Sequence, residues 1–239
     1  MLRIQTQPDG TLWLAEDARL QAPGTQIAGT FGIVTGERPY FTQVNLRASP
    51  LDVALLEQLL PGGLPVDGLL VGTVEVSGPL SALETRGTLQ FADRRGGGAD
   101  ADVSWRGVLD VRDPSRISAR SMNADVRRLD LGLLSALNPD LALAGSVSGR
   151  VQGTGAADRL SFSASLQHRA GGAFSTFEGG GTVAGSGAAR RFDVTMTATP
   201  LTLEDLAVQV PALAGLSGEL RGPLHVAGTA DDLDFDAQL

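Results

Sequence analysis

A glycine spacing that occurs three times constrains the fold of this chain more than any other feature. Glycines separated by three and then five residues stand within residues 68–78, 145–155 and 218–228. A leucine-led segment precedes each copy, at Leu51, Leu129 and Leu201. Recurrence at about 75 residues indicates repeated structural units. We expect one elongated repeat domain over residues 1–239, with units at roughly 1–50 (partial), 51–128, 129–200 and 201–239 (truncated).

Residues within each copy alternate between apolar or glycine and polar. In the third copy, one set is Gly218, Leu220, Gly222, Leu224, Val226 and Gly228. The positions between them include Glu219, Arg221 and His225. A period of two places the two sets on opposite faces of a strand, and a one-sided pattern is typical of antiparallel sheets. We therefore predict an all-β fold: an elongated, curled antiparallel sheet (β-taco or half-pipe) of roughly 12 to 15 strands in repeated units.

Short helices are expected only at the leucine-led segments. In the first of them, Ser49 is expected to cap the helix, Pro50 suits its first turn, and Pro61 ends it. The composition agrees, because Gly at 31 of 239 residues and charged residues at 19 % disfavour long helices. Aromatic residues make up only 5 %, which gives little volume for a two-layer core and favours an open trough. A filled core, with glycines that only permit the sheet to coil, is the alternative.

Charge and cysteine content exclude several classes of function. The formal net charge is −8, and all 19 basic residues are Arg, so nucleic acid is a poor partner. The absence of Lys excludes a Walker-type phosphate loop and a Schiff-base lysine. The absence of Cys excludes disulfides, thiolate metal sites and thiol nucleophiles. Because no catalytic signature is found either, we expect no enzyme, no catalytic residue, no cofactor and no metal. No signal peptide or spanning helix is visible.

Isolated polar and aromatic residues have structural interpretations. His168 and His225 stand alone in strand-like segments and are expected to face solvent. The run Asp231 to Asp236 lacks the Gly and Glu of a calcium loop and reads as a solvated strand face. Trp13 and Trp105 are expected in the core. Three arginine pairs are expected to be ordinary surface charge, and contacts to phosphate are the alternative. The pairs are Arg94-Arg95, Arg127-Arg128 and Arg190-Arg191.

The cadence Leu-x-Gly-x-Leu-x-Gly-x-Leu-x-Val-x-Gly followed by Leu-x-Phe is clearest at residues 216–235 and 141–162. It resembles the TamB/AsmA-like family of translocation and assembly module proteins, over residues 51–239 well and over 1–50 loosely. The resemblance implies a taco-shaped sheet with an apolar groove, in a full-length protein anchored in the inner membrane and extending through the periplasm and cell envelope of a diderm bacterium. It also implies phospholipid transport, outer-membrane biogenesis and a partner of the Omp85 class in protein assembly. The anchor is missing here, as in an internal segment.

The groove would be lined by the apolar set of the repeated strands. Phospholipid acyl chains would gain about 0.8 kcal/mol per buried CH₂ and could slide along an aliphatic wall, which is transport without chemistry. The rival is a structural or adhesive β-repeat protein with a filled core, and an enzyme on a β scaffold is the weakest interpretation. Edge strands also favour self-association of the isolated segment. The predicted lining is Leu70, Val74, Val76, Val147, Val151, Leu160, Phe162, Leu220, Leu224, Val226, Leu233 and Phe235.

Overall fold

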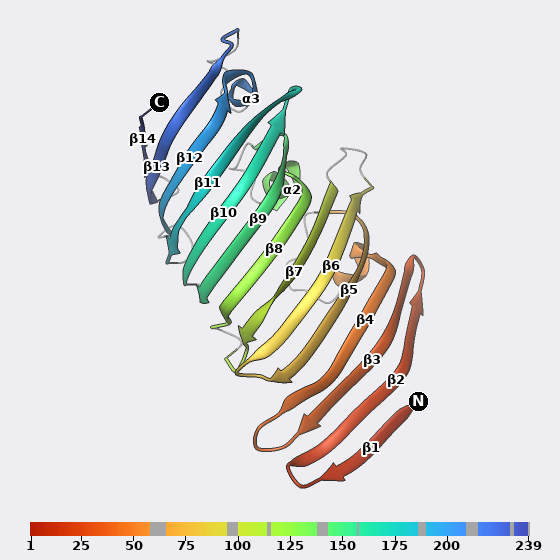
Figure 1. Cartoon of the computed structure of the whole chain (residues 1–239). Helices are drawn as coiled ribbons and strands as arrows, with labels where there is room; N and C mark the ends of the chain where they lie inside the picture. Colours follow the sequence, from red (N-terminus) through yellow and green to blue (C-terminus); the bar gives the residue numbers. More distant parts are fainter. Residues whose placement is uncertain are drawn as a thin grey trace. The chain divides into compact units, whose positions relative to one another are not determined.

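The chain is an antiparallel β protein in which strands follow one another in the sheet as they do in the sequence (Figure 1). The computed structural model describes residues 1–57, 66–94, 100–113, 116–137, 143–156, 158–185, 190–208, 215–229 and 232–238. These residues contain 14 strands and three short helices. The all-β, curled antiparallel sheet with a few short helices is thereby confirmed. Two compact units divide the chain, Met1–Arg120 and Ser121–Leu239.

Unit 1 is built of seven strands, each paired antiparallel with the next. A short helix, α1 (Val53–Glu57), follows the fourth strand. A turn at Pro8-Asp9 joins the first two strands. The strands are β1 (Leu2–Gln7), β2 (Gly10–Ala22), β3 (Thr25–Thr35), β4 (Tyr40–Asp52), β5 (Gly68–Pro79), β6 (Leu83–Asp93) and β7 (Asp100–Asp110).

Unit 2 repeats this organisation after β8 (Ser118–Asp130), the strand within which the two units divide. Its helices are α2 (Gly132–Leu137) and α3 (Leu203–Ala207), so a helix follows every fourth strand of the chain. Its further strands pair antiparallel in order. They are β9 (Ser146–Ala156), β10 (Arg159–Ala170), β11 (Ala173–Ala184), β12 (Arg191–Thr202), β13 (Glu219–Thr229) and β14 (Asp232–Ala237).

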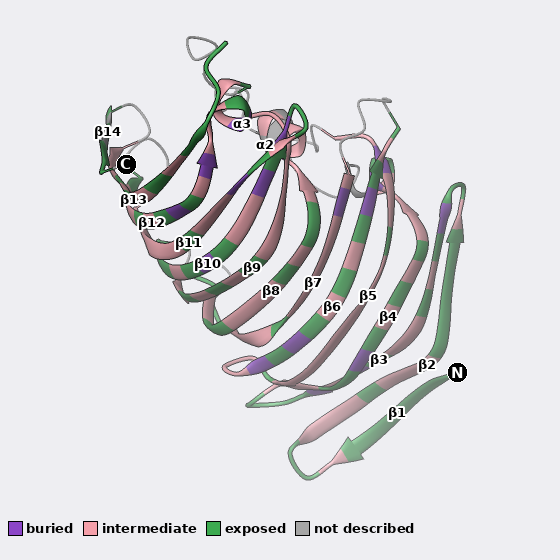
Figure 2. Ribbon diagram, turned by 45° about the horizontal axis from the view of Figure 1, so that its top comes forward, coloured by how far each residue is buried: buried purple, intermediate pink, exposed green. Residues whose placement is uncertain are grey.

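The strand register confirms the alternation of apolar and polar faces. In unit 1, Val74 lies opposite Leu46 on β4 and Gly87 on β6. In unit 2, Phe162 lies opposite Gly153 on β9 and Gly181 on β11. Directly opposed residues share a face of a sheet. We call the face that carries Val74 in unit 1, and the face that carries Phe162 in unit 2, the inner face. The sheet of each unit curls (Figure 2).

The single-layer sheet leaves much of its surface in water. The accessible surface is 14397 Å². Two compact globular domains of about 120 residues each would together expose about 12,000 Å². Among the described residues, large side chains that are almost fully buried are rare, and Val34 at 0 % exposure is one of them. The trough that the low aromatic content favoured is therefore supported over a two-layer core.

The helices begin later than the sequence suggested. Asp52, and not Ser49, caps α1: its Oδ1 accepts the Ala54 N–H at 3.1 Å, while Ser49 still belongs to β4. The strand continues because Leu51 pairs with Leu70 on the inner face of β5, which satisfies the backbone and leaves the leucine half-buried. The expected end at Pro61 lies outside the described residues.

Candidate functional site

The predicted groove residues of unit 1 share the inner face of β5. Leu70 lies opposite Leu51 and Phe91, and Val76 lies opposite Val44 and Thr85. All three predicted residues, Val74 included, are half-buried. An aliphatic surface in this state is neither packed into a core nor fully solvated, so it can still gain free energy by burying apolar area.

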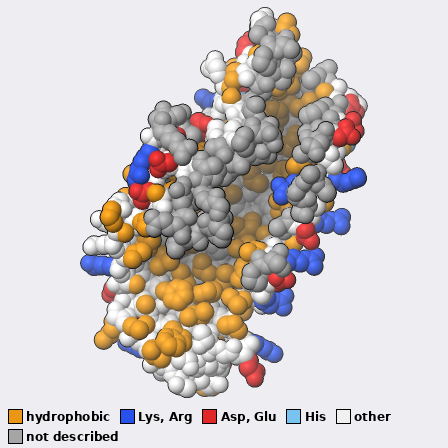
Figure 3. Space-filling view, turned by 180° about the vertical axis from the view of Figure 1, so that it is seen from behind, with side chains coloured by type: hydrophobic (Ala, Val, Ile, Leu, Met, Phe, Trp, Pro, Cys, Tyr) orange, Lys and Arg blue, Asp and Glu red, His pale blue; other side chains and the backbone are white. Residues whose placement is uncertain are grey.

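An apolar hollow lies on the inner face at β1–β3. It is a shallow hollow, open to solvent, with a volume of about 410 Å³, and it is lined by Leu2, Trp13, Ala15, Phe31, Ile33 and Thr35. Leu2 is 66 %, Trp13 42 % and Phe31 38 % exposed. The ring of Phe31 packs edge-on against Phe41, with centroids 5.8 Å apart. Figure 3 shows hydrophobic side chains gathered on a hollowed face.

This hollow was not predicted, because Trp13 was expected in the core. That prediction is wrong: within the residues that the structure describes, no second layer covers the inner face of β2, and the indole stays in contact with solvent. The indole N–H donates to Thr35 Oγ1 at 3.3 Å, which holds the ring across the strands. The sequence carried one signal: Leu2 and Ile4 stand two residues apart and therefore share one face of a strand. In the structure, Ile4 pairs with Trp13 on that face.

The predicted groove residues of unit 2 also fall on one face. Phe162 stands between two glycines, and Leu160, which is 36 % exposed, stands between Gly155 and Val183. The remaining predicted positions follow the same register: Val147, Val151, Leu220, Leu224 and Val226. The backbones of Leu233 and Phe235 pair with Gly228 and Val226, and their side chains lie outside the described part of the structure.

At two positions the protein's own rings occupy the space above glycines. A Cβ on Gly87 would lie 2.5 Å from the ring of Trp105, and one on Gly68 would lie 2.7 Å from the ring of Phe91. Trp105 therefore packs over Gly87 but is only half-buried, short of the core position predicted for it, and its N–H donates to Thr85 Oγ1 at 3.3 Å. The inner face of unit 1 is thus partly filled at β5–β7 and hollow at β1–β3.

The prediction that His168 faces solvent is wrong. His168 lies on the inner face, 9 % exposed, opposite Val147 and Ser175. Its Nδ1 is 2.7 Å from Asp205 Oδ2, and its Nε2 is 2.9 Å from the Ala144 carbonyl oxygen. The even-numbered apolar set from Leu160 to Leu166 continues into His168, which is the signal that could have revealed its direction.

These groups do not form a catalytic triad, although a serine, a histidine and an aspartate meet. A triad needs the serine hydroxyl on the imidazole. Here Ser175 Oγ accepts the Thr202 N–H at 3.0 Å, and both imidazole nitrogens face other partners. These bonds tie the end of β12 to β11, and His168 to Asp205 of α3.

Ion pairs and hydrogen bonds on the outer face and at the strand ends keep polar groups in water. His225 meets the expectation, at 46 % side-chain exposure and with Nε2 3.0 Å from Asp193 Oδ1. The described residues of the acidic run, Asp232, Asp234 and Asp236, are exposed on β14, also as expected. No group of three or more potential metal ligands occurs among the residues that the structure describes.

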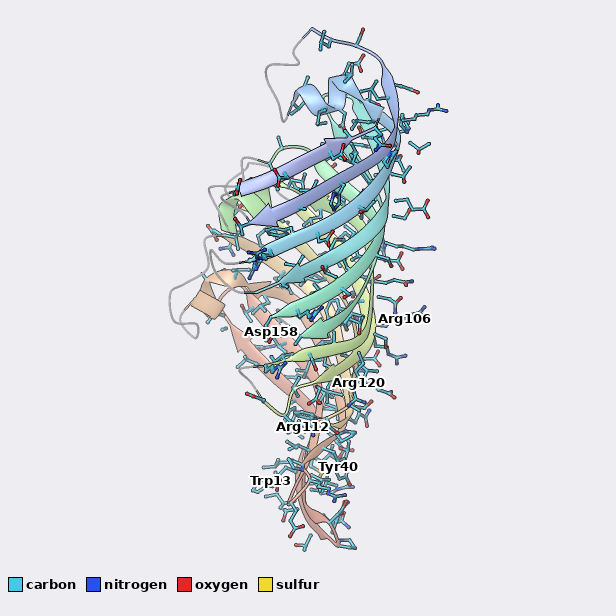
Figure 4. The ribbon with its side chains drawn as sticks, turned by 90° about the vertical axis from the view of Figure 1, so that its left-hand side faces the viewer. Trp13, Tyr40, Arg106, Arg112, Arg120 and Asp158 are labelled. Carbon is cyan, nitrogen blue, oxygen red and sulfur yellow. The ribbon has the colours of Figure 1, made fainter. Side chains whose placement is uncertain are left out.

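Both residues of the pairs Arg127-Arg128 and Arg190-Arg191 are exposed, as expected of surface charge, whereas the pair Arg94-Arg95 is only partly described. Arg94 donates to Asp52 Oδ2 at 2.6 Å, and this bond holds the pKa of Asp52 below its ordinary value. Its neighbour Arg95 is not among the described residues. Arg112 similarly lowers the pKa of Asp110 by a side-chain hydrogen bond at 2.6 Å. Figure 4 shows Arg106 pointing away from the inner face, as is typical of solvated surface charge.

Fold and site define a class: a single-layer antiparallel β protein with an apolar face partly open to solvent. No protein-family model, curated protein or solved structure matches the chain. Within the described residues, no helix has the length and apolar character needed to cross a membrane.

Proposed function

We propose that the inner faces bind the acyl chains of phospholipids, in a non-enzymatic segment of an envelope protein of the TamB/AsmA-like kind. The observation that carries the proposal is the hollow of about 410 Å³, whose exposed lining is apolar. Exposed apolar surface on a soluble fold marks a site that another apolar surface covers. An extended acyl chain is a suitable occupant because the inner face is a row of aliphatic and aromatic side chains along successive strands.

The energetics suit transport more than tight binding. Each methylene that leaves water contributes about 0.8 kcal/mol, whichever aliphatic side chain it meets. An acyl chain can therefore move along the inner face with small changes in free energy. The headgroup would stay in water at the rim, where charged groups such as Arg94 lie.

The cellular setting of the proposal comes from the sequence resemblance. We place the segment in the periplasm of a diderm bacterium, within a longer protein anchored in the inner membrane. In that setting it would carry phospholipid between membranes and support outer-membrane protein assembly with an Omp85-class partner.

A structural β-repeat protein with a filled core is the second candidate. The rings of Trp105 over Gly87 and of Phe91 over Gly68 favour it, because they fill the inner face at those points. If such filling extended along both units in solution, the chain would act as a rigid spacer with its function on the outer face.

Native mass spectrometry of the purified chain with phospholipid tests the proposal. Val74→Asp and Leu224→Asp each place a carboxylate on an inner face, and we expect both to lose bound lipid. Val71→Asp is the matched control, because Val71 lies on the opposite face of the same strand as Val74 and is 39 % exposed. It should keep lipid as the wild type does. Equal lipid on all four proteins, with unchanged circular dichroism, would refute an inner-face site.

A further inference from the structure

The most deeply buried side chain of helix α3 is a carboxylate and not an apolar group. The helix contacts β10, β11 and β12, and its buried residue is Asp205, 2 % exposed. Leu203 and Leu206 of the same helix are only half-buried. Helix α1 differs, because its buried anchor is Val53, 3 % exposed.

The attachment of Asp205 is a single buried pair. Its Oδ2 meets His168 Nδ1 at 2.7 Å, while its Oδ1 has no hydrogen-bond partner. The Ala144 carbonyl accepts from His168 Nε2, so the imidazole is oriented with Nδ1 toward the helix. A buried carboxylate loses hydration, and one strong bond with a bare second oxygen offsets that loss incompletely. Besides the bond from the Leu203 N–H to the Gly218 carbonyl oxygen at 3.0 Å, the docked position of α3 is therefore held by a polar contact that water can replace.

The strands that α3 contacts carry the most deeply buried inner-face residues of unit 2. Ser175 and Ala198 are 0 % exposed, Leu201 is 5 % and Ala170 is 7 %. Figure 2 shows buried segments on these strands beside α3. Elsewhere on the same face Leu160 is 36 % exposed. The helix thus covers one end of the inner face of unit 2.

We propose that α3 is a releasable flap, latched by the His168–Asp205 pair, that controls access of an acyl chain to this end of the inner face. The inference rests on the proposed function and adds its regulation. Opening replaces the His168–Asp205 bond by bonds to water and frees the small residues Ala170 and Ala198, over which a chain can lie.

Hydrogen exchange tests the latch without any lipid. Asp205→Asn removes the charge at nearly constant size, and we expect amide exchange at residues 203–208 to rise about tenfold, with β12 and β13 unchanged. Asp193→Asn is the matched control, because Asp193 pairs with a histidine at 3.0 Å on the exposed face. It should leave α3 unchanged. Faster exchange of β12 to the same extent as α3, or no change in α3, would overturn the latch.

A double variant tests the same idea in the opposite direction. His168→Leu with Asp205→Leu replaces the polar latch by an apolar contact like that of Val53 in α1. Such replacements hold or strengthen attachment when packing is good. We expect slower exchange of α3 than in the wild type, and faster exchange would contradict the proposal even if Asp205→Asn failed to fold.

Binding of the fluorescent fatty acid 11-(dansylamino)undecanoic acid separates the flap from the proposed function. We expect Asp205→Asn to bind it several-fold more tightly than the wild type, and the double leucine variant more weakly. Absence of binding in every variant, with the exchange changes intact, would reject acyl binding and keep the releasable helix. Equal binding in every variant, with no exchange change, would reject the flap and keep acyl binding.

Discussion

Glycine at the inner face serves different purposes at different residues. A Cβ on Gly87 would lie 2.5 Å from both the Thr73 carbonyl oxygen and the Trp105 ring, so only glycine fits there. A Cβ on Gly153 would meet Leu160 and Ser161 at 3.6 and 3.8 Å, which is ordinary contact. At some inner-face glycines, such as Gly87, the protein's own atoms fill the space that a side chain would need. At others, such as Gly153, there is room for a methyl group.

Substitution by alanine should separate the two kinds of glycine. We expect Gly87→Ala to lower the free energy of unfolding by about 1–3 kcal/mol, because the ring of Trp105 must move. Gly153→Ala should be neutral or stabilising by about 0.5 kcal/mol, since it restricts the unfolded chain without a clash. Denaturant unfolding checks both values, and Trp13→Phe in the background isolates the emission of Trp105. Equal losses in the two variants would contradict the assigned contacts.

At the scale of elements, the same hydrogen bond fixes the strand-to-helix junction in both units. The Asp52 N–H donates to Thr25 Oγ1 at 2.9 Å before α1, and the Thr202 N–H donates to Ser175 Oγ at 3.0 Å before α3. Both hydroxyl residues are buried. Local sequence pattern does not predict this hydrogen bond, because the partners lie 27 residues apart in each case and only the hairpin brings them together.

The ion pair at the start of α1 should make stability depend on pH. The side-chain hydrogen bond from Arg94 lowers the pKa of Asp52 below its ordinary 3.8. Folding therefore favours the ionised carboxylate, and this stabilisation is full above the ordinary pKa and is lost as pH falls through the lowered one. We expect Arg94→Gln to be less stable than the wild type near neutral pH, with the difference vanishing in strong acid.

Urea unfolding of both proteins across that pH range measures the trend. Arg106→Gln is the control, because Arg106 points away from the inner face and shows no salt bridge within the described chain. A difference between wild type and Arg94→Gln that stayed constant with pH would show that Asp52 does not carry the effect.

At the scale of the whole molecule, a single-layer sheet buries less apolar surface than a compact domain. The heat-capacity change of unfolding follows the apolar area that becomes exposed. We expect calorimetry to give less than the usual 12–15 cal/mol/K per residue. A value in the usual range at several protein concentrations, with a monomeric mass, would mean that the inner faces are filled and would favour the spacer interpretation.

Much of the fold followed from local pattern. Alternation placed Val74, Phe162 and Leu224 on inner faces, because a strand turns successive side chains to opposite sides whatever its neighbours are. Helix starts were less predictable. Ser49 and Asp52 are both good caps, and only pairing with β5 decided that the strand continues through Leu51.

Local sequence pattern predicted the strand faces, the antiparallel sheet and the recurrence of short helices, because each depends on side chains within a few residues of one another. The tertiary structure alone decided that Trp13 lines a hollow and that His168 meets Asp205, 37 residues further along the chain. Both depend on which surfaces another element covers. Curling of the sheet and docking of α3 set that coverage, and no local pattern specifies either.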